Sequence, residues 1–192
     1  LIEMPRPSIA NERREDILEA FEACALEKGL GATTLADVAE KAGLPRPLVR
    51  HFMGNRADMV TGLIERMTQR AITGIEKALS APDGADEYDS LRIVLTQSFM
   101  DPVTNRLMIQ LWQHSWHDKH LHEQLRDVYE RSVEQIHDRV FPAPTKTSRE
   151  LAHAITSLAL GNAVLGQFGV HPDNDESLMI AGNAITQQKH RR

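Results

Sequence analysis

Apolar side chains recur every three to four residues along most of the chain, which is the period of an α-helix with one buried face. Gly, Pro and Asp interrupt the pattern, and no segment alternates apolar and polar residues as a strand does. We therefore predict an all-α fold of about nine helices. The predicted helices cover residues 11–28, 35–42, 46–53, 56–79, 87–100, 104–117, 121–140, 147–169 and 175–188.

The long helix predicted over 56–79 separates two parts of the chain. Three helices precede it, and the helices that follow are numerous enough to form a larger body. We predict an N-terminal domain over residues 1–54 and a C-terminal domain over residues 55–192.

Residues 34–53 have the pattern of a helix-turn-helix, in which two short helices cross at a tight turn. Thr34 can cap the first helix, and Ala39 is small enough for a close crossing. Gly43 allows the left-handed backbone that the turn needs. Apolar residues follow at the spacing of an inner face: Val38, Leu44, Val49 and Phe52. The helix over 46–53 can then present its outer face to the major groove of DNA.

Basic residues gather in the same segment, although the whole chain has a net charge of −5. Residues 41–56 contain four Lys or Arg and no acidic residue. Where the charge lies matters more for DNA binding than its total, and arginine pairs with guanine or with phosphate. The pattern therefore predicts that six residues bind DNA: Thr34, Arg46, Pro47, Arg50, His51 and Arg56. Charge alone leaves a solvated basic face as the alternative.

The segment GATTLADVAEKAGLPRPLVRHFMGNRADMV resembles the N-terminal signature of the TetR-type transcriptional regulators. The shared features are a threonine pair, an acidic residue before Val-Ala, an Ala-Gly turn, a short recognition helix and a basic residue at the start of the next helix. A later stretch, LWQHSWHDKHLHEQLRDVYERSVEQ, is similar to the C-terminal domain of the choline-regulator-like branch. The chain departs from the family at Pro45, where a Ser or Thr cap is usual, and at Arg50, where tyrosine is common.

The resemblance implies a homodimeric repressor that binds a pseudo-palindromic operator in double-stranded DNA and is released by a small-molecule effector, without catalysis or cofactor. Phe52 stands near a position that often meets phosphate in the family, so it joins the candidate DNA-binding residues. The candidate ligand-binding residues are Met67, Met108, Trp112 and Trp116. The candidate dimer-interface residues are Ala154, Leu158, Gly161, Leu165, Ala181 and Ile185. From composition alone, an ordinary core remains an alternative for both sets.

A small helical enzyme or a metal-binding protein that uses residues 112–122 is the alternative from another class. His114, His117 and Asp118 share one helical face, but no cysteine is near and Asp118 can equally cap the next helix. The single cysteine, Cys24, lies on the apolar stripe of the first helix, which favours packing over redox chemistry. No apolar run is long enough to span a membrane and no secretory signal is visible, so we expect a cytoplasmic protein with no membrane partner.

Overall fold

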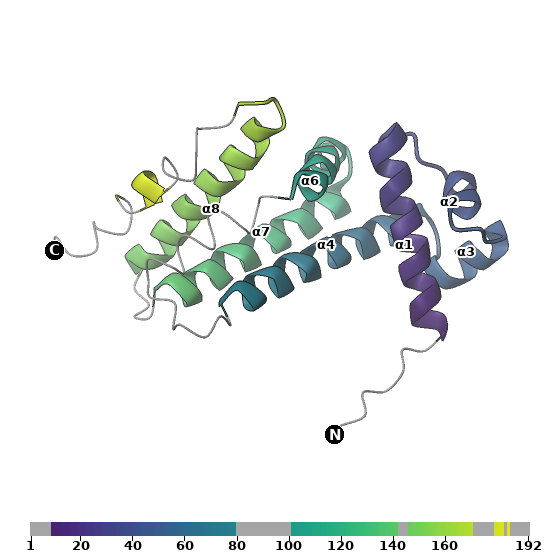
Figure 1. Cartoon of the computed structure of the whole chain (residues 1–192), viewed down its shortest axis with the longest axis horizontal. Coiled ribbons are helices and arrows are strands. Elements are labelled where there is room, and N and C mark those ends of the chain that lie inside the picture. The colour runs from purple at the N-terminus through teal and green to yellow at the C-terminus, as the bar shows by residue number, and fades with distance from the viewer. Residues whose placement is uncertain (1–8, 80–100, 142–145, 171–178, 183, 185–192) are drawn as a thin grey trace, which may run out of the picture. The chain divides into compact units, whose positions relative to one another are not determined.

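The computed structural model describes residues 9–79, 101–141, 146–170, 179–182 and 184, and nearly all of them are helical (Figure 1). In chain order the helices are α1 (Ile9–Lys28), α2 (Leu35–Lys41), α3 (Arg46–Met53), α4 (Arg56–Leu79), α6 (Pro102–Ser115), α7 (Lys119–Val140) and α8 (Lys146–Gly166). None of the described residues forms a β-strand, and the all-α class predicted from the sequence is confirmed. Helical residues at 179–182 fall within the last predicted helix, and the helix predicted over 87–100 lies outside the described residues.

The helix boundaries follow local capping chemistry. α3 and α4 begin and end at the predicted residues. α6 begins at Pro102, two residues before its predicted start, because the Asp101 side chain accepts two backbone N–H hydrogen bonds at 3.2 Å. α7 begins at Lys119 instead of Leu121, because Asp118 is its cap and accepts the N–H of Leu121 at 3.0 Å. The prediction that Asp118 can cap a helix is therefore confirmed.

The chain forms two compact units, Leu1–Arg66 and Met67–Arg192, and the dividing point lies within α4. In the N-terminal unit α2 and α3 pack against α1 and against each other (Figure 1). The fully buried side chains of this unit include Ile17, Phe21, Val38, Val49, Met59 and Leu63. α1 supplies the largest of them, so the helix-turn-helix is held on a core built around the first helix. The functional division proposed at residue 54 stays a prediction.

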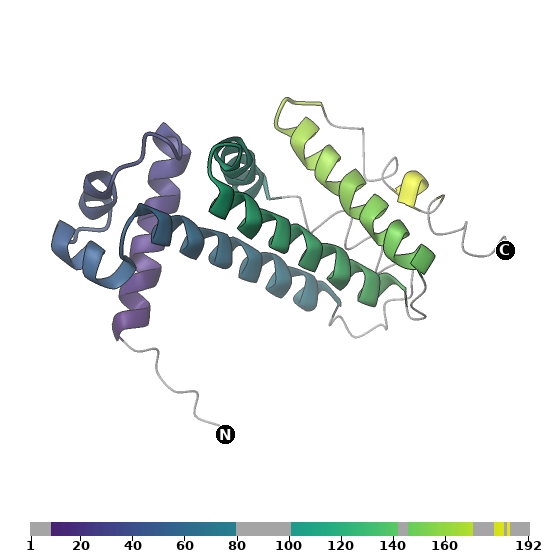
Figure 2. The ribbon, with the colours of Figure 1, turned by 180° about the vertical axis from the view of Figure 1, so that it is seen from behind.

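The C-terminal unit contains α6, α7 and α8, with α7 packed against both of the others. Figure 2 shows α7 and α8 from behind, with the end of one close to the start of the other. Their shared core consists of Val133, Ile136, Phe141, Ala152, Ile155, Ala159 and Met179. At the junction, His137 Nε2 lies 2.9 Å from Ser148 Oγ, which ties the two helices together. Within the described ranges, no helix is both long enough and apolar enough to cross a membrane.

Candidate nucleic-acid interface

A reciprocal capping box fixes the start of α2. The backbone N–H of Thr34 donates to Asp37 Oδ2 at 2.8 Å, and the N–H of Asp37 donates to Thr34 Oγ1 at 3.3 Å. Lys28 Nζ lies 2.7 Å from the other carboxylate oxygen of Asp37. The Lys28 ammonium and the Thr34 donors lower the pKa of Asp37 to about 2, so this carboxylate is ionised at neutral pH. The exposed Thr34 hydroxyl, predicted to meet phosphate, is thus already part of a cap.

The turn between α2 and α3 has the backbone that the sequence predicted. Gly43 has a φ of 63°, and a Cβ added there would meet nothing within 4 Å. The glycine is therefore required by backbone conformation and not by lack of space. The N–H of Leu44 donates to the carbonyl of Ala39 at 2.9 Å and closes the turn. Val38 and Val49 are fully buried on either side of it, as expected for the inner face of a helix-turn-helix.

α3 turns one face inward and leaves a wider face open. It begins at Arg46 after Pro45, which makes no side-chain capping hydrogen bond, as predicted. Val49 is buried and Phe52 is half-buried. The exposed predicted DNA-binding residues of this helix are Arg46, Pro47, Arg50 and His51. The ring of His51 lies edge-on to that of Phe52, with centroids 5.1 Å apart, so the exposed imidazole packs against the half-buried phenyl ring.

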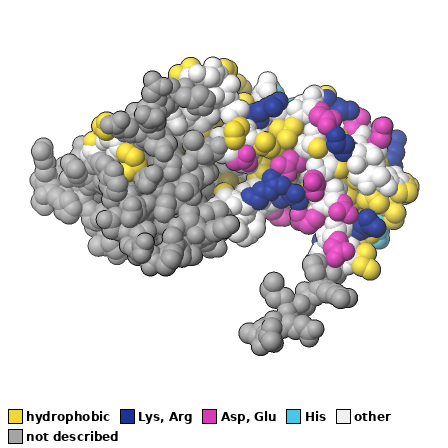
Figure 3. Space-filling model, viewed as in Figure 1, with side chains coloured by type: hydrophobic (Ala, Val, Ile, Leu, Met, Phe, Trp, Pro, Cys, Tyr) yellow, Lys and Arg dark blue, Asp and Glu magenta, His cyan; other side chains and the backbone are white. Residues whose placement is uncertain are grey.

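The two arginines of α3 differ from every other lysine and arginine described in the N-terminal unit. Among the described residues, neither the Arg46 nor the Arg50 guanidinium group has a hydrogen-bond or ion-pair partner. The other lysines and arginines of the unit are engaged with acidic side chains or backbone carbonyls: Arg13, Arg14, Lys28, Lys41, Arg56 and Arg66. Figure 3 likewise shows basic and acidic side chains interspersed over the described surface that it views.

Arg56 has a role in the fold that its position in the sequence did not reveal. Its Nη2 donates to the carbonyl oxygen of Leu30 at 2.7 Å, which ties the start of α4 to the segment that follows α1. Arg56 stays a predicted DNA-binding residue, and one nitrogen of its guanidinium group is already engaged within the fold.

The predicted ligand-binding residues are exposed to different degrees. Met67 is buried, Met108 and Trp112 are half-buried, and Trp116 at the end of α6 is 81% exposed. The two indoles, both predicted to contact a ligand, therefore lie in different environments. Trp112 keeps the partly enclosed surroundings of a ligand contact, whereas Trp116 is open to solvent in the single chain.

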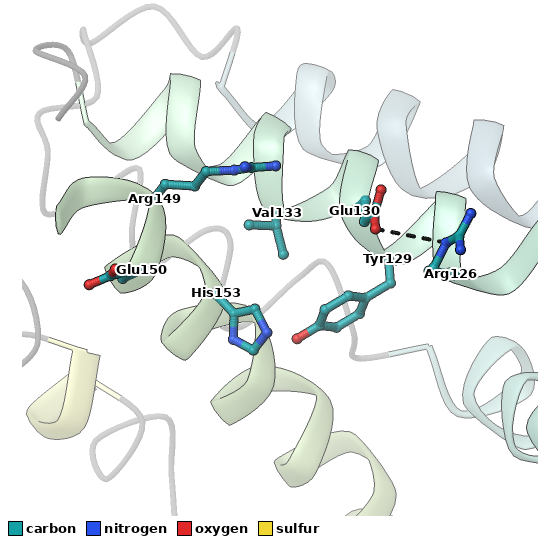
Figure 4. Close-up of a pocket in the computed structure, with 7 residues that line it drawn as sticks. All are labelled: Arg126, Tyr129, Glu130, Val133, Arg149, Glu150 and His153. Carbon is teal, nitrogen blue, oxygen red and sulfur yellow. Dashed lines mark ion pairs between the residues drawn. The ribbon is translucent and has the colours of Figure 1, made fainter. Parts of the chain in front are cut away.

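A groove of about 630 Å³ lies instead between α7 and α8 (Figure 4). It is lined by Arg126, Tyr129, Glu130, Val133, Arg149, Glu150 and His153. Val133 is buried, and the rings of Tyr129 and His153 meet edge-on with centroids 5.5 Å apart. Arg126 is paired with Glu130 at 3.8 Å. The sequence did not indicate this groove, because charged residues four apart on a helix are typical of a solvated face.

α8 carries two apolar stripes. One faces the core and contains Ala152, Ile155, Ala159 and Ala163. The other contains four predicted interface residues: Ala154 and Leu158 are half-buried, and Gly161 and Leu165 are exposed. Of the remaining two, Ala181 is half-buried and Ile185 lies outside the described residues. The single chain thus leaves an apolar edge of α8 uncovered at Leu165.

Among the described residues, no three His, Cys, Asp or Glu side chains are placed to hold a metal ion. His137 does lie between Asp138 and Ser148 at 2.9 Å from each, but Ser148 is 2% exposed, so its hydroxyl is closed to a substrate. Cys24 is buried, as predicted, and burial raises the pKa of its thiol.

Comparisons with known proteins agree with this architecture. The HTH-type transcriptional regulator BetI of Stenotrophomonas maltophilia (strain R551-3) is 29% identical over 178 residues, which cover 86% of this chain and 89% of that protein. A TetR-family transcriptional regulator from Rhodococcus sp. has a similar structure, with a TM-score of 0.78, 17% identity and coverage of 91% and 98% of the two chains. The multidrug binding protein EbrR, solved with imidazole, gives a TM-score of 0.69 at 18% identity over 95% and 94%. No protein-family profile matches the chain.

These likenesses run over most of the chain and are not confined to the helix-turn-helix. The resemblance to TetR-type regulators and the all-α fold predicted from the sequence are therefore confirmed. BetI and the protein from Rhodococcus sp. are regulators of transcription, which supports the prediction that this chain is not an enzyme.

Proposed function

We propose that this chain, which has the TetR-type fold, is a homodimeric transcriptional repressor that binds a pseudo-palindromic operator and leaves it when a small molecule binds. The proposal rests on the two exposed guanidinium groups of α3, those of Arg46 and Arg50, which have no hydrogen-bond or ion-pair partner among the described residues. Cations held in internal pairs are already satisfied, whereas these two are available to an external anion. The edge of guanine and the phosphate group are both partners that arginine binds with two hydrogen bonds.

The two arginines are assigned different roles by their positions on α3. Arg46 is the first residue of the helix, and the N-terminal residues of a recognition helix contact base edges. Arg50 lies one turn later, near the end of the helix, where we assign it to the phosphate backbone. Pro47 lies in the first turn and restricts the backbone there, so the backbone that carries the Arg46 side chain is already ordered before DNA binds.

Arg46→Ala and Arg50→Ala are expected to weaken DNA binding in different ways. DNA selected from a random pool by the wild-type protein provides the operator, and fluorescence anisotropy measures affinity at several salt concentrations. Arg46→Ala should cost about 1–3 kcal/mol and relax the preference at one operator position. Arg50→Ala should weaken all sequences alike and reduce the salt slope by about one.

Arg13→Ala provides the matched control, since Arg13 is an exposed arginine that pairs with Asp16 on its own helix. Its affinity and salt slope should equal those of the wild-type protein. If both α3 variants fold and bind selected DNA as tightly as this control, α3 is not the helix that binds DNA.

We assign the small-molecule effector to the C-terminal unit. EbrR, which shares the fold, is described as a multidrug binding protein, and this supports a ligand-binding role for the fold. The α7–α8 groove has a volume typical of small-molecule sites, with an apolar base at Val133 and aromatic rings at Tyr129 and His153. The surroundings of Trp112 are the second candidate, from the sequence.

His153→Ala and Trp112→Phe distinguish these two locations. A compound library is screened for release of the labelled operator, and the affinity of each active compound is measured with both variants. If the groove is the site, His153→Ala should weaken the compound by about two- to tenfold, because it loses one ring contact, and leave DNA affinity unchanged. A compound affected by Trp112→Phe alone places the site at Trp112, and one affected by neither variant contradicts both assignments.

A further inference from the structure

Leu48 is a large apolar side chain on the surface of the helix-turn-helix. It is 41% exposed, whereas its neighbour Val49 is fully buried and fills the inner face of α3. Among the residues described in the N-terminal unit, Ile9 is the other exposed large hydrophobic residue, and it is the first residue of α1. Leu48 is therefore the exposed large apolar side chain of α3, the helix that also carries Arg46 and Arg50.

The local backbone holds Leu48 in a defined position. It is the third residue of α3, and its N–H donates to the carbonyl of Pro45 at 2.9 Å. Prolines stand three residues before it and immediately before it, and each restricts its own φ. The first turn of the helix is thus stiff, and Leu48 can contact a partner with little loss of backbone freedom.

The residues near Leu48 in the sequence indicate which kind of molecule it can contact. Arg46 precedes it by two residues and Arg50 follows it by two, and both are open to an anion. Arg46 and Arg50 are one turn apart and share one side of α3, whereas Leu48, two residues from each, lies on the other flank of the exposed face. A helix face with cations on one flank and an apolar side chain on the other matches the major groove of DNA, where phosphates and guanine edges lie beside the methyl group of thymine. That methyl is the apolar feature that distinguishes one base edge from the others.

We propose that Leu48 reads a thymine in the operator by packing against its C5 methyl group. The inference rests on the proposed function, because it requires α3 to enter the major groove. It adds a base-reading residue that makes no hydrogen bond and that carries no charge. Pro47, which is exposed next to Leu48, widens the apolar surface that meets the methyl group.

Replacing single thymines by deoxyuridine tests the proposal, because this removes the methyl group and keeps every hydrogen-bonding group of the base. The probe is the operator selected by the wild-type protein, with one thymine per half-site replaced at a time. At one position the wild-type protein should bind the uracil operator about three- to fivefold more weakly, the effect of one buried methyl group. Leu48→Ala should bind the thymine operator more weakly by at least that factor and should bind both operators equally.

Ile9→Ala is the matched control, since it also shortens an exposed apolar side chain, and it should keep the wild-type preference for thymine. Leu48 is 41% exposed, so its shortening should disturb the core little, and circular dichroism is used to check that each variant is folded. A wild-type protein that is indifferent to every replacement overturns the inference, as does a Leu48→Ala protein that keeps the preference. If the wild-type protein selects no DNA sequence at all, the proposed function itself fails.

Discussion

Leu165→Glu is expected to convert the proposed homodimer to monomers and to weaken operator binding by about 100-fold or more. Leu165 is 51% exposed on α8, and Gly161 one turn earlier has open space where a Cβ would stand. A second copy of the chain can approach closely there, and a carboxylate buried in that contact would have to lose its hydration. The loss of DNA affinity follows because two linked recognition helices bind about 10²–10⁴ times more tightly than one alone.

Sedimentation equilibrium measures the oligomeric state, and anisotropy with the selected operator measures affinity. Val103→Glu is the matched control, because Val103 is also an exposed apolar residue, at 40%, but lies at the start of α6. This control should stay dimeric and bind DNA normally. A Leu165→Glu protein with the sedimentation and DNA affinity of the control would move the interface away from this edge of α8.

Arg66→Met is expected to lower the free energy of unfolding by about 3–5 kcal/mol. The Arg66 side chain is 17% exposed, and its Nε lies 3.4 Å from Glu22 Oε2. The Glu22 side chain, on α1, is 8% exposed, and Arg66 also pairs with Glu15 on the same helix. Removal of the arginine leaves the Glu22 carboxylate in a place where water reaches it poorly. This cost greatly exceeds that of breaking an exposed pair.

Urea denaturation of three variants separates the buried charge from the packing. The double variant Glu22→Leu with Arg66→Met should recover most of the loss, because two apolar side chains can replace a buried ion pair. Arg13→Met breaks the exposed pair with Asp16 and should cost about 0–1 kcal/mol. Equal costs for Arg66→Met and Arg13→Met would mean that burial adds nothing to the Glu22–Arg66 pair.

Local chemistry makes much of the N-terminal unit predictable from its amino-acid sequence. The capping pair at Thr34, the turn at Gly43 and the limits of α3 and α4 all depend on residues within a few positions of one another. Short-range hydrogen bonds and backbone preferences are encoded in such windows, so the pattern is sufficient there. The start of α7 differs from the predicted one by two residues, because a cap at Asp118 adds residues that carry no apolar period.

Tertiary structure decided which charged side chains are paired between different helices. Lys41 pairs with Glu27 on another helix, and Arg66 reaches Glu22 across more than forty positions of the sequence. Such pairs depend on how helices pack, so the sequence could mark residues 41–56 as basic without showing which arginines stay open. Exposure follows the same rule: Leu48 and Val49 are adjacent apolar residues in an eight-residue helix, and the packing of α3 buries only Val49 completely. The sequence by itself therefore determined the positions of the described helices to within a few residues and the helix-turn-helix motif. The packing of distant helices decided which side chains remain available to a partner.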